Sequence, residues 1–279
     1  MTLALTARGP IEYRLTGVGP VVMILKGGHS SRATRLGHER LADHGFTVLE
    51  PSRPGYDRTP PAVGRSAQDA ADAMVALLDD LGIERASLVV ISAAGHTGIE
   101  LARRHPTRID RVSFECAVSL PWPARIRRGG RVLFGPAQVV VWGATRAGLR
   151  IAPSFTLRIQ LAPVTTLDSA RLVRDMDAVT LETYIDVYRT LWSGRGFVCD
   201  LGHRSDSSES IGQPALIMSS ANDPSVPAQH VARLAALCSN SKQVMLDAES
   251  HFIWIGRAAE VAWQRRLAFL QAVVDRRNA

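Results

Sequence analysis

The stretch Leu88-Val-Val-Ile-Ser-Ala-Ala-Gly95 is the clearest indication of the fold. Its first four residues are apolar and three of them are β-branched, as in a short strand that is buried on both faces. A helix-like pattern follows and runs toward Arg104. Ser92 therefore lies on a strand-to-helix turn, where a serine can act as a nucleophile if its neighbours are small. The alternative is that Ser92 only caps the next helix, because serine is a preferred N-cap residue.

Short apolar runs alternate with amphipathic segments on both sides of this stretch. Besides 88–91, strands are predicted at 21–25, 46–49, 111–115, 215–218 and 243–246. Helices are predicted at 30–43, 67–81, 228–237 and 257–274, in addition to the one that follows Ser92. This order is typical of an α/β fold in which helices cover a mostly parallel sheet.

The alternation stops between residues 121 and 210. Most of this segment has a helical pattern, which is interrupted at Pro123, Gly129-Gly130, Pro136, Pro153 and Pro163. About ninety residues are too many for a simple crossover between two strands. We therefore predict a core formed by residues 1–120 and 211–279, with residues 121–210 inserted as a helical lid or cap.

Length and composition agree with one large soluble domain. The chain has 279 residues, 46% of them apolar, and a formal charge of +7, which excludes a disordered chain, collagen and a small disulfide scaffold. Its longest uncharged stretches, such as 132–145, fall short of the about 20 residues that span a bilayer. The first residues lack the features of an export signal, so we expect a cytoplasmic protein with no integral membrane segment.

The cysteines and histidines show no pattern of metal ligands. Cys116, Cys199 and Cys238 lie far apart and lack Cys-x-x-Cys spacing, which argues against both a disulfide framework and a zinc site. The histidines also lack metal-ligand spacing. We expect no metal and no cofactor.

The basic residues are distributed unevenly. All but Lys26 and Lys242 are arginines, as in proteins encoded by GC-rich genomes, and seven arginines but no Asp or Glu lie between residues 121 and 167. These arginines could hold a substrate carboxylate or phosphate, rest on an anionic membrane surface, or simply be solvated. No stacking pattern or DNA-binding motif accompanies them, so we do not expect nucleic acid as a partner.

Two further residues continue the pattern that Ser92 begins. Asp223 directly follows the strand predicted at 215–218, and His251 follows the strand predicted at 243–246. The order Ser, Asp, His along the chain, with each residue on a loop at the carboxyl end of a strand, favours a catalytic triad. Taken singly, Asp223-Pro is a common turn and a lone histidine is more often structural.

Several phrases of the sequence together resemble the α/β-hydrolase superfamily, in particular its lidded, cytoplasmic serine hydrolases. These are Leu25-Lys-Gly-Gly-His29, where the family has its oxyanion loop, Pro51-Ser-Arg-Pro-Gly-Tyr-Asp57, Leu101-Ala-Arg-Arg-His-Pro106 and Ile211-Gly-Gln-Pro-Ala-Leu-Ile-Met218. The resemblance covers nearly the whole chain. It implies an eight-stranded, mostly parallel sheet flanked by helices, with an inserted helical cap.

The resemblance also implies a mechanism. His251 would take the proton of Ser92, Asp223 would orient and stabilise the imidazole, and the serine would attack a carbonyl carbon. The backbone N–H groups of Gly28 and Ala93 would form the oxyanion hole, in which one donor is worth about 3 kcal/mol.

Three residues depart from the family pattern. The strand-to-helix turn that holds the serine is called the nucleophile elbow, and Val90 stands where this elbow usually has glycine. Lys26 stands where the family often has histidine, and His29 where many relatives have proline. Val90 could tilt the elbow helix, which leaves open a non-catalytic or weakly active ligand-binding protein. Glu115, at the end of the strand before the insertion, is an alternative to Asp223 as the acid.

We expect a serine hydrolase that cleaves a small or medium carboxylic ester through an acyl-enzyme, with a small molecule as its substrate. A proline iminopeptidase-like enzyme and a carbon–carbon bond hydrolase remain alternatives, and a homo-oligomer is left open. Gly27-Gly28 is not a Gly-x-Gly-x-x-Gly loop, which argues against a nucleotide-dependent oxidoreductase. Apolar residues of the insertion could line a substrate pocket or pack the cap, among them Trp122, Phe134, Trp142, Phe155, Leu157, Tyr184, Tyr188 and Trp192.

Overall fold

A single sheet organises the chain in this computed structural model, which describes residues 2–272. Within that range the sheet has eight strands in the order β1-β2-β4-β3-β5-β6-β7-β8. The strands are β1 (Thr2–Thr6), β2 (Gly9–Thr16), β3 (Val21–Leu25), β4 (Thr47–Pro51), β5 (Ala86–Ile91), β6 (Ile109–Glu115), β7 (Ala215–Ser220) and β8 (Ser241–Leu246). From β4 to β8 all neighbouring strands are parallel, which confirms the α/β fold class predicted from the sequence.

The antiparallel edge formed by β1 and β2 was not among the predicted strands. β1 pairs with β2, and β2 pairs with β4, in antiparallel register. Most residues of these two strands are exposed or half-buried. They therefore lack the continuous apolar run that identifies a central parallel strand.

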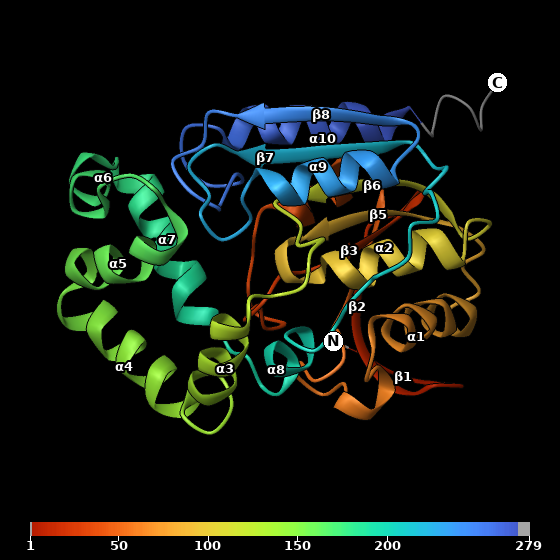
Figure 1. Ribbon diagram of the computed structural model, residues 1–279, viewed down its shortest axis with the longest axis horizontal. Helices are drawn as coiled ribbons and strands as arrows, with labels where there is room; N and C mark the ends of the chain where they lie inside the picture. Colours follow the sequence, from red (N-terminus) through yellow and green to blue (C-terminus); the bar gives the residue numbers. More distant parts are fainter. Residues whose placement is uncertain (1, 273–279) are drawn as a thin grey trace.

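Helices cover both faces of the sheet (Figure 1). On one face, α1 (Ala67–Asp80), α2 (Gly95–Arg104) and α9 (Ala228–Leu237) pack on the central strands. On the other face, α10 (Ala259–Gln271) packs with apolar residues of β3, β4 and β5. Ser66 caps α1 by accepting a hydrogen bond from the Asp69 N–H, in a full capping box.

The helix predicted at 30–43 is wrong. The structure has irregular turns there, followed by a 3-10 helix, η1 (His38–His44). Gly37 has a left-handed φ of 80°, which stops a helix from continuing through it. The carbonyl oxygens of Ser31 and Thr34 accept hydrogen bonds from the Lys26 ammonium. Residues 273 and 274 of the predicted C-terminal helix lie outside the described residues.

A set of helices lies between β6 and β7 and extends to one side of the sheet (Figure 1). These helices are α3 (Ala124–Leu133), α4 (Gln138–Ile151), α5 (Pro153–Leu161), α6 (Ser169–Asp175), α7 (Ala178–Thr190) and α8 (Gly196–Asp200). Trp142, Leu157, Tyr184 and Tyr188 are buried in a cluster shared with β3 and β5. Within residues 2–272, no helix is both long and apolar enough to cross a membrane.

Candidate active site

Ser92 lies on a strained turn between β5 and α2. Its φ is 50°, in the left-handed region that non-glycine residues rarely adopt. A 3-10 turn, η3 (Ser92–Ala94), joins the strand to the helix. Such strain is kept where the surrounding structure requires it, and it is characteristic of a nucleophile elbow.

Val90, the departure from the elbow pattern, is accommodated by a glycine on the following helix. Val90 is fully buried. A Cβ added to Gly98 would lie 2.5 Å from the Val90 methyl groups, so the absence of a side chain at Gly98 leaves room for the valine. In this chain the space between β5 and α2 is therefore provided by the glycine on the helix, with the valine on the strand.

The structure brings Ser92, His251 and Asp223 into one hydrogen-bonded row. His251 Nε2 lies 2.9 Å from Ser92 Oγ, and His251 Nδ1 lies 2.6 Å from Asp223 Oδ2. The other Asp223 oxygen accepts hydrogen bonds from the backbone N–H groups of Ser225 and Val226. Burial opposes ionisation of Asp223, but His251 and these N–H groups prevail and hold the pKa of its carboxyl below the ordinary value.

Glu115, the alternative acid, has different partners. Its carboxylate forms two hydrogen bonds with the Arg266 guanidinium, at 2.6 and 2.7 Å, and one with His38 Nε2 at 2.8 Å. Arg266 and His38 overcome the effect of burial and hold the pKa of Glu115 far below its usual value. Among the described contacts, Glu115 makes none with His251, so it serves a separate buried ion pair.

The loop after β3 lies against the elbow. A Cβ added to Gly27 would be 3.0 Å from Ser92 Cβ, and one added to Gly28 would be 3.4 Å from Ala93 Cβ. The first of these contacts is tight, and a Cβ at Gly28 would also lie 2.8 Å from the Phe197 ring, so both positions favour glycine. The Gly28 N–H donates to no acceptor among residues 2–272, which leaves it available to a substrate oxygen.

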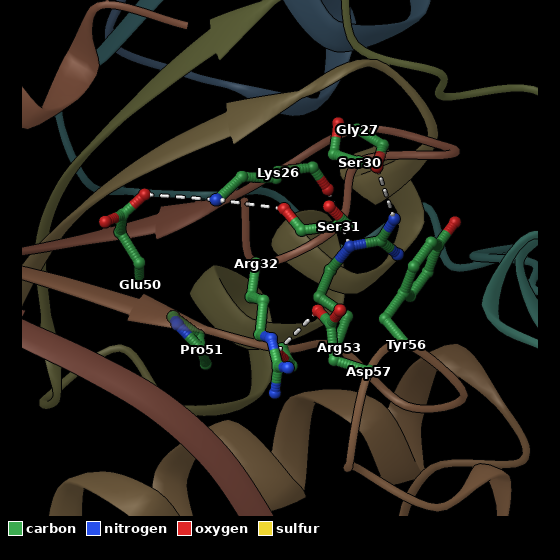
Figure 2. Close-up of a pocket in the computed structure, with 11 residues that line it drawn as sticks. Lys26, Gly27, Ser30, Ser31, Arg32, Glu50, Pro51, Arg53, Tyr56 and Asp57 are labelled. Atoms are coloured by element: carbon green, nitrogen blue, oxygen red, sulfur yellow. Dashed lines mark hydrogen bonds and ion pairs between the residues drawn. The ribbon is translucent and has the colours of Figure 1, made fainter. Parts of the chain in front are cut away.

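Arg53 supports this loop from its other side. Its guanidinium donates to the Lys26 carbonyl at 2.7 Å and to the Gly27 carbonyl at 3.2 Å (Figure 2). It also forms a bidentate ion pair with Asp200 of α8, and the Tyr56 hydroxyl donates to the same carboxylate at 2.6 Å. The Gly27 carbonyl and the Gly28 N–H belong to one peptide group, so Arg53 also helps to fix the orientation of that N–H.

Sequence analysis did not assign a role to Arg53 or Asp200. Arg53 lies within residues 51–57, which resemble a turn of the family. This resemblance was the signal in the sequence that could have pointed to Arg53. Nothing in the sequence indicates Asp200, which lies 147 positions from its partner.

Lys26 forms its ion pair with Glu50, and Ser92 is not among the described partners of its ammonium. Its ammonium lies 3.2 Å from a Glu50 oxygen and donates to the Ser31 carbonyl (Figure 2). The small pocket drawn in Figure 2 is lined by these residues, and its lining includes none of Ser92, Asp223 and His251.

Aromatic side chains pack beside Ala93, the residue that follows the serine. Phe197 and Leu201 pack with Ala93, and the partly buried Trp122 and Phe134 join them. The ring of His29 lies 4.1 Å from Phe134 and 4.0 Å from Phe197, measured between centroids. Burial lowers the pKa of His29 to about 3, so its ring is neutral at physiological pH.

One group of side chains near the site has metal-ligand atoms close together. Ligand atoms of Cys116, Asp223 and His251 lie within 4.8 Å of one another. However, the Asp223 and His251 atoms are hydrogen-bonded to each other at 2.6 Å, and a metal ion needs about 2 Å to each ligand. Burial also raises the pKa of the Cys116 thiol, which disfavours the thiolate. These residues do not fit a resident metal.

The sequence and structure both match known hydrolases. Residues 20–258 match the family model described as alpha/beta hydrolase fold. The uncharacterized hydrolase YcgS of Bacillus subtilis is 30% identical over 272 residues, which cover 95% of this chain and 96% of that protein. An alpha/beta hydrolase fold protein from Nakamurella multipartita superposes with a TM-score of 0.83 at 25% identity, covering 97% and 99% of the two chains.

The chain therefore belongs to the α/β-hydrolase family, as its sequence indicates. A relative with a more specific name is the 2-hydroxy-6-oxononadienedioate/2-hydroxy-6-oxononatrienedioate hydrolase of Cupriavidus pinatubonensis. It is 23% identical over 285 residues, which cover 96% of this chain and 91% of that protein.

Proposed function

We propose that this protein is a cytoplasmic serine hydrolase that cleaves a carboxylic ester of small or medium size, without a cofactor. The observation that carries the proposal is the row Ser92–His251–Asp223, with hydrogen-bond distances of 2.9 and 2.6 Å. The left-handed backbone of Ser92 supports the same assignment.

The proposed reaction has two half-reactions. His251 removes the proton of Ser92 as its oxygen attacks the carbonyl carbon, and the ionised Asp223 stabilises the resulting imidazolium. The N–H groups of Gly28 and Ala93 receive the developing oxyanion. His251 then protonates the leaving alcohol, and a water molecule activated by the same histidine releases the acid.

The surroundings of Ser92 favour an apolar substrate. Phe197 and Phe134 lie on the side of Ala93, and Phe252 and Trp254 make ring contacts with His251. We assign residues 121–210 to a cap, because Phe134 and Phe197 reach the elbow from this segment. An apolar wall of this kind binds acyl or alcohol groups by removing their surface from water.

Cleavage of a carbon–carbon bond in a keto acid is the second candidate. It is favoured by the relative from Cupriavidus pinatubonensis, whose name describes an oxo diacid as the substrate. The same serine and histidine could perform either reaction.

The test combines labelling with turnover. A fluorophosphonate is expected to label the wild type and Ser219→Ala, a matched buried serine on β7, but not Ser92→Ala. Among p-nitrophenyl esters of increasing acyl length, Ser92→Ala and His251→Ala should lose about 10³-fold or more in kcat. Labelling without ester hydrolysis would favour the keto-acid substrate. A folded wild type that is neither labelled nor active would refute the proposal in favour of a binding protein.

A further inference from the structure

Large apolar side chains are exposed on three helices of the insertion. Among these are Val132 on α3, Val140 and Ile151 on α4, and Phe155 on α5, with exposed fractions of 61, 73, 85 and 59%. Ile126, Leu133, Val139 and Ile159 in the same segment are also exposed. Surface apolar residues are common singly, but a group of this size marks an interaction site.

The exposed residues of α4 form a continuous stripe. Val140, Ala144, Ala147 and Ile151 are all exposed and follow one another at spacings of four, three and four residues. Residues at these spacings lie on one face of an α-helix. The chain continues directly into α5, where Phe155 and Ile159 are again exposed four residues apart.

Arginines accompany this apolar surface. Of the seven arginines between residues 121 and 167, Arg125, Arg128, Arg131, Arg150 and Arg158 are exposed. None of the seven forms an ion pair within 4 Å in the part of the chain that the structure describes. The chain has only two lysines, and this general preference for arginine accounts for the type of basic residue found here. It does not explain why Asp and Glu are absent between 121 and 167, or why valine, isoleucine and phenylalanine face the solvent there.

The combination of charge and apolar surface selects the partner. In a symmetric contact between two copies, arginines would face arginines with no acidic residue to balance them. Nucleic acid would satisfy the arginines but not the aliphatic stripe. The boundary of an anionic bilayer satisfies both, because apolar side chains enter the headgroup region while arginines bind lipid phosphates.

We propose that the exposed faces of α3, α4 and α5, called here the α3–α5 surface, dock on a bilayer that contains anionic lipid. Of these helices, α4 and α5 lie at the periphery of the molecule, away from the sheet, and α3 lies between them and α8 (Figure 1). Phe134, at the end of α3, packs on Phe197 next to Ala93. The same helix thus joins the proposed docking surface to the wall of the candidate active site. The proposal stands on the surface alone and does not require the proposed ester hydrolysis.

The test is co-sedimentation of the full chain with lipid vesicles. At 0.1 M salt, we expect binding to phosphatidylcholine vesicles that contain 30% phosphatidylglycerol to be at least about tenfold stronger than to pure phosphatidylcholine, and to weaken at 0.5 M salt. Two variants test the two components of the surface. The triple change Arg125→Gln, Arg128→Gln, Arg131→Gln and the double change Ile151→Asp, Phe155→Asp should each reduce binding about tenfold or more.

Matched changes elsewhere serve as controls. Val179→Asp replaces an exposed apolar residue on α7, and Arg171→Gln with Arg174→Gln replaces exposed arginines on α6. Both should bind vesicles as the wild type does. Equal binding to both lipid compositions, no binding to either, or equal losses in the controls would overturn the proposal. A wild-type dimer that Ile151→Asp dissociates, without vesicle binding, would assign the surface to self-association instead.

Discussion

Replacement of Arg53 by lysine tests how the proposed oxyanion loop, Gly27-Gly28, is held. The arginine makes hydrogen bonds to two carbonyl oxygens, those of Lys26 and Gly27, and two more to the Asp200 carboxylate. All of these groups are buried. A lysine keeps the positive charge, but its single ammonium cannot reach both the carboxylate and the two carbonyls.

The expected magnitude follows from the bonds that are lost. Two buried hydrogen bonds at about 1 kcal/mol each, together with poorer pairing of Asp200, lower the free energy of unfolding by roughly 2–4 kcal/mol. The Gly27–Gly28 peptide also loses the donor that orients it. Because complete removal of one oxyanion donor costs about 10²–10³ in kcat, a misoriented Gly28 N–H should cost about 10- to 100-fold.

The assay compares an ester with its thiono analogue, in which sulfur replaces the carbonyl oxygen. Sulfur is a weak hydrogen-bond acceptor, so the preference for the oxygen ester reports on the oxyanion hole. Arg53→Lys should reduce this preference by about as much as it reduces kcat, with KM little changed. Arg266→Lys is the matched control, since it alters an equally buried bidentate pair that does not touch the loop. It should lower stability but leave the preference intact. A folded Arg53→Lys with the kcat and oxygen-to-sulfur preference of the wild type would refute the reasoning.

Three further predictions concern the elbow, the acid and a buried histidine. Gly98→Ala should lower the free energy of unfolding in urea by about 1–3 kcal/mol, because its Cβ meets Val90 at 2.5 Å. Val90→Ala in the same chain should restore most of the lost stability. Additive effects of the two changes would contradict this contact. Asp223→Asn should reduce kcat by about 10³- to 10⁴-fold. Glu115→Gln should lower the melting temperature but change kcat only a few-fold. The reversed pattern of kcat values would make Glu115 the acid of the triad. Unfolded His29 takes up a proton near pH 6.5 and the folded protein only near pH 3, so acidification between these values favours unfolding. His29→Asn should therefore make stability less dependent on pH by up to about 1.4 kcal/mol per pH unit, and an unchanged slope between pH 6.5 and 4 would count against a ring that stays neutral in the folded protein.

The central parallel strands, and the positions of Ser92, Asp223 and His251 at their carboxyl ends, were accessible from the sequence. Central parallel strands are buried on both faces, so each is marked by a short apolar run. Residues that directly follow such runs must meet at one edge of the sheet, since parallel strands share their direction. Local pattern and chain direction together therefore sufficed to expect these three side chains near one another.

The local sequence pattern was less informative where side chains, and not the backbone N–H groups of a helix, donate hydrogen bonds to the backbone carbonyls. The residues after β3 have helical periodicity, but Lys26 binds the carbonyls of Ser31 and Thr34 and Gly37 has a left-handed φ. Side-chain hydrogen bonds and a left-handed glycine thus outweigh a weak helical preference. The half-exposed strands β1 and β2 were missed because pairing defines them, β1 with β2 and β2 with β4, and not a continuous apolar run.

The sequence by itself determined the family, the central strands of the sheet and the likeness of the turn at Ser92 to a nucleophile elbow, because these depend on residues close together in the chain. The tertiary structure alone decided three matters that depend on distant residues. It paired Glu115 with Arg266 rather than with His251, it accommodated Val90 beside Gly98, and it joined Arg53 to Asp200 beneath the glycine loop. Such contacts are set by how close-packed elements fit together in space, and spacing along the chain does not encode that fit.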